Sequence, residues 1–169
     1  GVPTTIFSQL AKIAQTKNAK FVADTSGAAL REAAETGAFL LKPNLGELAS
    51  LVDKKTIEIT ELETVAKQVL YRYPVEILVV SAGADGAMLF TKNETYKVVA
   101  PPVERKSTVG AGDSMVAGII FSLSQQSTLK KALQFGVACG TAATINPGTE
   151  LCTPSDAAML YDAILASDK

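Results

Sequence analysis

Residues Thr108–Ser114 read Thr-Val-Gly-Ala-Gly-Asp-Ser and open an apolar run that continues to Leu123. Gly110 and Gly112 let the backbone take conformations that are closed to residues with a Cβ atom, so several N–H groups can converge on one anion. The run that follows contains no proline and is typical of a buried helix. The stretch therefore predicts a glycine turn at a helix N-terminus, where unpaired amides and the helix dipole favour negative charge.

Asp113 distinguishes this stretch from a plain phosphate-binding turn, as does the absence of the Lys-Ser/Thr ending of a P-loop. A carboxylate would repel phosphates, and it is more useful beside the hydroxyl group that attacks. Protein kinases use an aspartate in this way, to accept the proton of the substrate hydroxyl. The alternative is that Asp113 is the N-cap of the helix that follows. The spacing leaves both interpretations open, and the first predicts phosphoryl transfer with Asp113 as the base.

Composition excludes several classes of function. The chain has 169 residues, the size of one domain, and its net charge of −1 predicts no nucleic-acid or membrane partner. The apolar runs are too short to span a bilayer, and two cysteines make no disulfide framework, so we expect a cytoplasmic protein. Cys139 and Cys152 are expected to be packed or incidental thiols rather than metal ligands. Histidine is absent, which excludes Ser-His-Asp and Cys-His catalysis. Any catalytic base is therefore a carboxylate or a lysine.

The order of apolar and turn residues predicts strands that alternate with helices and then three helices in succession. The expected helices are Ile6–Thr16, Ala28–Glu35, Asn44–Val52, Glu61–Tyr71, Ser114–Ser124, Leu129–Ile145 and Pro154–Ala166. The expected strands are Lys20–Asp24, Ala38–Leu41, Glu76–Ser81 and a hairpin of Ala87–Thr91 with Thr95–Val99. This order implies an α/β fold with a largely parallel sheet covered on both faces. Ligands of such sheets bind beyond the carboxyl ends of the strands.

Asn44 and Glu47 stand three residues apart after a predicted strand. Both can project from the first helical turn toward a phosphate-bound Mg²⁺, through its waters. The alternative is structural, with Asn44 capping the helix and Glu47 completing a capping box.

Three other segments also have two interpretations. Ser81–Gly86 could lie under a nucleotide or form an ordinary turn. Asp24–Gly27 could offer a carboxylate near the sheet edge, and a helix cap is the simpler interpretation. The helix that begins at Leu129 carries glycines and alanines on one surface, which predicts close helix packing, and a flat purine slot between Val137 and Thr141 is the alternative.

Four segments together resemble the carboxyl-terminal portion of a ribokinase/PfkB-type sugar kinase in their order and spacing. They are Lys42-Pro43-Asn44-x-x-Glu47, Ser81-x-Gly83-x-x-Gly86, Ser107–Ser114 and Phe135–Ala138. Within that family, the Gly-Ala-Gly-Asp-Ser-Met form and the tail Ala142–Thr149 are most similar to the minor 6-phosphofructokinase group. The 1-phosphofructokinases and tagatose-6-phosphate kinases share much of the pattern. The resemblance implies a ribokinase-like three-layer α/β/α fold and ATP-dependent phosphorylation of a phosphorylated ketohexose, foremost fructose 6-phosphate to fructose 1,6-bisphosphate in glycolysis.

The resemblance also implies a role for each matching residue. Asp113 would be the base, and the amides of Gly110, Ala111, Gly112 and Asp113 would form an anion hole for the γ-phosphoryl group. Asn44 and Glu47 would hold Mg·ATP. The other nucleotide contacts would come from Lys42, Ser81, Gly83, Gly86, Arg105, Val137 and Thr141. A monovalent cation, K⁺, would bind oxygen atoms of Ser107, Val109, Ala143, Asn146 and Gly148.

The resemblance covers residues 1–169. It implies that they form the ATP-binding and catalytic-base part of a single PfkB carbohydrate kinase domain. The start at Gly1 matches an interior point of the family chain. The amino-terminal half of the family pattern, which supplies a Gly-Gly-rich sugar-recognition segment and a β-lid used for closure and dimerisation, is missing from these residues. We therefore expect a homodimer of the full-length protein, and weak Mg·ATP binding without sugar phosphorylation by the 169 residues alone. Gly46 stands where related phosphofructokinases can carry a lysine, so that nucleotide contact is not expected.

Overall fold

A computed structural model describes residue 3 and residues 5–168. Each helix and strand predicted from the sequence has a counterpart in it. The helices are α1 (Ile6–Thr16), α2 (Gly27–Thr36), α3 (Leu45–Leu51), α4 (Leu62–Arg72), α5 (Ala111–Ser124), α6 (Leu129–Thr144) and α7 (Pro154–Ser167), with a short 3₁₀ turn, η1 (Gly83–Asp85). The strands are β1 (Val22–Ala23), β2 (Ala38–Leu41), β3 (Val75–Ser81), β4 (Ala87–Phe90) and β5 (Thr95–Val98).

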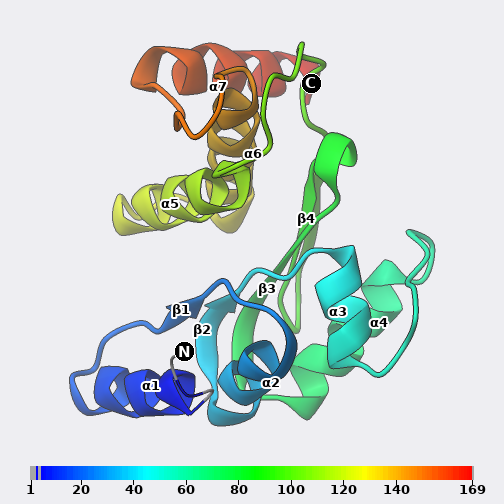
Figure 1. Cartoon of the computed structure of the whole chain (residues 1–169), viewed down its shortest axis with the longest axis vertical. Helices are drawn as coiled ribbons and strands as arrows, with labels where there is room; N and C mark the ends of the chain where they lie inside the picture. Colours follow the sequence, from blue (N-terminus) through cyan, green and yellow to red (C-terminus); the bar gives the residue numbers. More distant parts are fainter. Residues whose placement is uncertain (1–2, 4, 169) are drawn as a thin grey trace. The chain divides into compact units, whose positions relative to one another are not determined.

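The strands form one sheet in the order β1-β2-β3-β4-β5, and the first three strands are parallel (Figure 1). Ala23 pairs with Leu41 between β1 and β2, and Leu41 pairs with Leu78 between β2 and β3. The centre of β3 is an unbroken apolar run that is buried, as expected of a parallel strand covered on both faces. The carboxyl ends of β1, β2 and β3 therefore lie along one edge of the sheet.

The chain divides into two compact units. The first, here called the sheet unit, runs as far as Ser81 and includes Leu89–Thr95. The second, here called the helical unit, comprises Ala82–Met88 and the chain from Tyr96 onward. Each unit has buried leucine or isoleucine side chains of its own, for example Leu40 and Leu78 in the sheet unit and Ile119 and Leu133 in the helical unit. The two units are described separately below.

Two elements differ from the prediction by more than one residue at a boundary. The strand expected over Lys20–Asp24 is reduced to Val22–Ala23, because it is the edge strand and pairs with β2 through only two residues. The helix expected from Ser114 begins three residues earlier, at Ala111, directly after Gly110, because its first residue packs closely against Gly140 of α6. Among the residues that the structure describes, no helix is long and apolar enough to cross a membrane.

Candidate functional site

The N-terminus of α5 is built on Gly110, which is its N-cap residue. Gly110 has φ +76° and ψ 0°, and its carbonyl accepts a hydrogen bond of 2.9 Å from Ser114 N. A Cβ atom at this position would lie 2.5 Å from Leu151 Cδ2, so the turn needs glycine for both backbone and space. The first N–H groups of a helix have no acceptor inside it, and those of α5 follow this turn directly. The predicted anion-binding geometry at Gly110–Asp113 is consistent with this arrangement.

Asp113 is the third residue of α5, and the N-cap position belongs to Gly110. The interpretation of Asp113 as a helix cap is therefore wrong. Its side chain is exposed and makes no ion pair or side-chain hydrogen bond with the residues that the structure describes. The positive end of the helix dipole stabilises a carboxylate in the first turn, and this interaction requires no hydrogen bond to the carboxylate. Asp113 is thus an accessible carboxylate in the first turn of α5, and its role as a base stays a prediction.

Asn44 and Glu47 form a complete capping box at the start of α3 in the sheet unit. Asn44 Oδ1 accepts from Glu47 N at 2.9 Å, and Glu47 Oε2 accepts from Asn44 N at 2.8 Å. The structural interpretation is confirmed. Both side chains offer the hard oxygen donors that Mg²⁺ prefers, but no group of three acidic, histidine or cysteine side chains among the described residues could hold a metal ion. Their contact with a water-bound Mg²⁺ stays a prediction.

The sheet edge beside Asn44 carries two further predicted residues, Lys42 and Ser81. Ser81 ends β3, forms an isolated parallel bridge with Asn44, and its N–H donates to Pro43 O at 3.1 Å. Lys42 is buried, and its Nζ lies 3.1 Å from Asp24 Oδ2. The segment after β1 holds the N-cap residue of α2, Ser26, as the helix-cap interpretation expected, although its side chain makes no capping hydrogen bond. Sequence reasoning missed this ion pair.

The two glycines that follow Ser81 lie in the helical unit and differ in their surroundings. Gly86 has φ +86°, and a Cβ atom there would collide with the carbonyl oxygen of Val98, so the close approach of β5 explains this glycine. Gly83 has φ +60° in the turn η1, with nothing within 4 Å of a Cβ atom. Turn geometry therefore accounts for both glycines, and their contact with a nucleotide stays a prediction.

The close packing predicted for the helix after Leu129 is confirmed. A Cβ atom on Gly136 would collide with Ile119 Cγ1 of α5, and one on Gly140 would lie 3.0 Å from Ala111 O. Val137 and Thr141 are 1% and 8% exposed within α6. Little of their surface is available for a purine, so the slot between them stays a prediction.

The predicted monovalent-cation residues come together in the helical unit, where the loop before α5 meets the turn after α6. Ser107 Oγ donates to Gly148 O at 2.6 Å and accepts from Val109 N at 3.2 Å. Asn146 N donates to Ala143 O at 3.4 Å, and its side-chain amide donates to Leu151 O at 3.0 Å. These contacts bring several backbone oxygen atoms into one loop cluster. Arg105 lies exposed in the same loop, and its predicted place near the nucleotide stays a prediction.

Two polar groups of the helical unit, Ser114 and Cys139, are buried. Ser114, directly after Asp113, is 4% exposed, and its Oγ has no hydrogen-bond partner among the residues that the structure describes. Cys139 is buried, and burial together with the neighbouring Cys152 thiol raises the pKa of Cys139 to about 12. Cys139 is therefore a packed thiol, as predicted.

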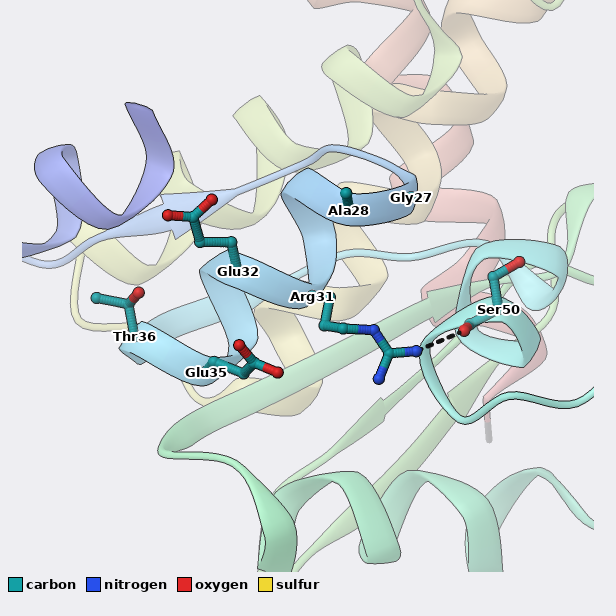
Figure 2. A pocket seen from close by; sticks show the side chains of 7 residues that line it. All are labelled: Gly27, Ala28, Arg31, Glu32, Glu35, Thr36 and Ser50. Atoms are coloured by element: carbon teal, nitrogen blue, oxygen red, sulfur yellow. Dashed lines mark hydrogen bonds between the residues drawn. The ribbon is translucent and has the colours of Figure 1, made fainter. Parts of the chain in front are cut away.

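A groove of about 700 Å³ in the sheet unit is lined by α2 and by Ser50 of α3 (Figure 2). Arg31 crosses it and donates to Ser50 O at 3.1 Å and to Asp53 Oδ1 at 2.8 Å. Glu32 and Glu35 also line it, and none of the predicted site residues does. Because Arg31 is already paired and no predicted site residue lines the groove, the groove has no part in the predicted phosphoryl transfer.

Residues 1–156 match the pfkB family of carbohydrate kinases, and the chain belongs to this family. It is 37% identical over 162 residues to the ATP-dependent 6-phosphofructokinase isozyme 2 of Escherichia coli (strain K12), which covers 95% of this chain and 52% of the relative. It is 35% identical to the 1-phosphofructokinase of Borreliella burgdorferi (88% of this chain, 48% of the relative). It is 33% identical to the tagatose-6-phosphate kinase of Staphylococcus epidermidis (81% and 46%). The chain spans about half the length of these relatives.

Solved structures agree with the family assignment. The crystal structure of Escherichia coli phosphofructokinase-2 in complex with potassium superposes with a TM-score of 0.91 at 36% identity, over 98% of this chain and 54% of that one. Arabidopsis thaliana ribokinase, at 20% identity, has a TM-score of 0.83 over 94% of this chain and 53% of that one, a likeness of fold alone. The fold is therefore the ribokinase-like α/β fold that the sequence predicted.

Proposed function

We propose that this chain carries the ATP-binding and proton-accepting part of a sugar-phosphate kinase. The acceptor is a hydroxyl group of a phosphorylated ketohexose, and fructose 6-phosphate is the foremost candidate. The observation that carries the proposal is the accessible Asp113 carboxylate in the first turn of α5, directly behind the left-handed Gly110. The similarity to phosphofructokinase isozyme 2 supports the choice of sugar, and 1-phosphofructokinase and tagatose-6-phosphate kinase activities are the alternatives.

The proposed reaction needs little covalent chemistry from the protein. Asp113 accepts the proton of the attacking sugar hydroxyl, whose oxygen bonds to the γ-phosphorus of ATP while the bond from that phosphorus to the β,γ-bridging oxygen breaks. ADP leaves and the sugar gains a phosphate. The amides at Gly110–Asp113 stabilise the charge on the transferring group, because they are fixed before the reaction by the turn and the helix.

Two cations belong to the proposal. Mg²⁺ would neutralise phosphate charge, held through waters by Asn44 and Glu47, whose oxygen donors suit it. K⁺ would bind the loop cluster of Ser107, Val109, Ala143, Asn146 and Gly148. The clustered carbonyl groups support that assignment, as does the potassium complex of the Escherichia coli relative. We also expect the natural polypeptide to be a homodimer, as the family resemblance implies.

The decisive test is the substitution Asp113→Asn in the natural polypeptide that contains this segment. We expect kcat to fall by roughly 10²–10⁴, the range for loss of a general base, while Mg·ATP binding survives. Asp156→Asn is the matched control, because Asp156 is also an acidic residue in the first turn of a helix, α7. Near-normal turnover of Asp113→Asn would remove this residue from the mechanism.

The second candidate is a nucleotide-binding module without turnover, favoured by the fact that the chain spans about half the length of its relatives. We expect the purified 169 residues to bind Mg·ATP weakly, measured by calorimetry. We expect no fructose 1,6-bisphosphate from ATP and fructose 6-phosphate. Measurable product formation by these residues alone would exclude this second candidate.

A further inference from the structure

The two cysteines of the chain meet inside the helical unit. Cys139 lies in the middle of α6, and Cys152 lies in the loop of residues 145–153 that joins α6 to α7. Their thiols form a hydrogen bond with each other. The sequence contains no third cysteine, so each thiol has one possible partner for a disulfide within the chain.

Cys139 is held in place by its packing. Its side chain lies against Gly118 of α5, where a Cβ atom would be 2.8 Å from Cys139 Sγ. Cys139 is 5% exposed and belongs to a helix of 16 residues. An oxidant in solution therefore does not reach this thiol first, and α6 fixes the position from which its sulfur atom reacts.

Cys152 differs in both respects, because it is half-buried and belongs to a loop. The carbonyl of its neighbour Leu151 accepts a hydrogen bond of 3.0 Å from the Asn146 side chain. In the same loop, Gly148 O accepts from Ser107 Oγ at 2.6 Å. A displacement of Cys152 therefore acts on the loop that carries Asn146 and Gly148, two of the proposed potassium residues.

We propose that Cys139 and Cys152 are a redox pair, which a low-molecular-weight disulfide such as oxidised glutathione joins into an intrachain disulfide that fixes the loop of residues 145–153 on α6. The formation of this disulfide goes beyond the proposed function and does not depend on it. The effect of the disulfide on the potassium residues rests on the proposed function and has a test of its own.

The oxidation takes two thiol–disulfide exchange steps. Cys152 loses its proton to solvent, and its thiolate attacks one sulfur atom of oxidised glutathione and releases one glutathione. Cys139 then loses its proton, and its sulfur attacks Cys152 Sγ and releases the second glutathione. The two cysteines lose two electrons and two protons, which the oxidised glutathione gains. The second step is the slower one, because burial foremost raises the pKa of the Cys139 thiol to about 12 and little thiolate forms at neutral pH.

The disulfide changes the position of the loop. Two hydrogen-bonded sulfur atoms must come closer before they can share a covalent bond. Cys139 is packed against Gly118, so Cys152 makes the larger part of this approach. Leu151 moves with Cys152, and this movement alters the contact between Leu151 O and the Asn146 side chain. We therefore expect the oxidised chain to bind K⁺ more weakly than the reduced chain.

A redox titration of the 169-residue chain tests the disulfide. The chain is equilibrated with mixtures of reduced and oxidised glutathione, the remaining thiols are alkylated, and the products are identified by mass spectrometry. We expect a monomer in which neither cysteine is alkylated and neither carries glutathione. Its equilibrium constant should be roughly 10–100-fold larger for the folded chain than for the chain in urea, because a fold favours a disulfide as much as that disulfide stabilises the fold. Equal constants would show that the fold does not hold the two thiols together and would overturn the inference.

Single variants separate the roles of the two thiols. Cys139→Ser should stop at a mixed disulfide of glutathione with Cys152, and Cys152→Ser should stay unmodified. Cys139→Ala replaces the first variant if the buried hydroxyl group prevents folding. A parent chain that accumulates only the glutathione adduct or a disulfide-linked dimer contradicts the pairing. A Cys152→Ser chain that takes up glutathione as fast as the parent contradicts the order of the two steps.

Thermal melts in potassium chloride and in choline chloride of equal ionic strength test the effect on the loop. Potassium should raise the midpoint of the reduced chain, and it should raise that of the oxidised chain by less. The double variant Cys139→Ala/Cys152→Ser is the matched control, and its potassium shift should not change on treatment with oxidised glutathione. Equal shifts of the reduced and oxidised parent would overturn the effect on the loop. A potassium shift in neither form would refute the proposed potassium site, whereas the redox titration contains no step that depends on potassium.

Discussion

Gly110 holds a backbone conformation that costs an L-residue roughly 1–2 kcal/mol. We expect Gly110→Ala to destabilise the helical unit by more than this, because its Cβ atom would also meet Leu151 Cδ2 at 2.5 Å. Gly148→Ala is the matched control, since Gly148 has φ +62° with nothing within 4 Å of a Cβ atom. Chemical denaturation of both variants gives the difference. Equal losses would show that the Leu151 contact is unimportant.

Cys139 and Cys152 should differ in reactivity although they lie against each other. The raised pKa of Cys139, about 12, keeps that thiol protonated at neutral pH, and the thiolate is the reactive form. Cys152 is only half-buried. We therefore expect a disulfide reagent at pH 8 to modify one thiol quickly in the folded chain and two in denaturant. Cys152→Ser should abolish the fast phase, and a fast phase that survives in this variant contradicts the assignment.

At the scale of elements, the capping box of α3 combines a structural role with the proposed metal role. Asn44→Ala removes the cap and should cost about 0.5–2 kcal/mol in unfolding free energy, with or without nucleotide. Glu47→Gln keeps an oxygen acceptor, so it should change stability less and weaken Mg·ATP binding more. Thr128→Ala, at the N-cap of α6, is the control for cap loss alone. Nucleotide binding unchanged by Glu47→Gln would leave Glu47 a purely structural residue.

The elements themselves were largely predictable because local chemistry decides them. The strand Ala38–Leu41 was predicted with its observed bounds, since Gly37, at φ +103°, ends α2 and Lys42-Pro43 follows the strand. The start of α5 was missed by three residues. Glycine is a poor helix former, so Gly110 and Gly112 argued against a helix here, while packing of Ala111 against Gly140 of α6 supports it. Tertiary contact decided that boundary.

At the scale of the whole molecule, motifs predicted contacts between residues close in sequence better than contacts between residues far apart. Asn44 and Glu47 are neighbours in sequence, and their reciprocal hydrogen bonds followed from spacing. Asp24 and Lys42 are 18 positions apart, and they meet only because β1 and β2 are adjacent and in a particular register. Strand order and register are properties of the assembled sheet. A sequence read segment by segment therefore gives candidates for a site but not its ion pairs.

Two exposed glutamates, Glu61 and Glu63, should affect how the stability of the whole chain changes with pH in the acidic range. Hydrogen bonds from Lys54 and from the Glu58 backbone lower the pKa of Glu61, and hydrogen bonds from Lys67 and Thr95 lower that of Glu63. A carboxyl group with a lower pKa in the folded state contributes stability above its unfolded value of 4.5. That contribution is lost as the pH falls through the folded pKa.

We therefore expect the double variant Glu61→Gln/Glu63→Gln to lose less stability than the parent as the pH falls below 4.5, and to be slightly less stable than the parent at pH 7. The effect should be small and should shrink in high salt, because both groups are exposed and screened. Thermal melts from pH 7 down to about pH 3 measure it, with Glu104→Gln as the control for removal of an exposed carboxylate that has no ion pair with a described residue. Parallel pH profiles of parent and double variant would show that these ion pairs do not shape the acid limb.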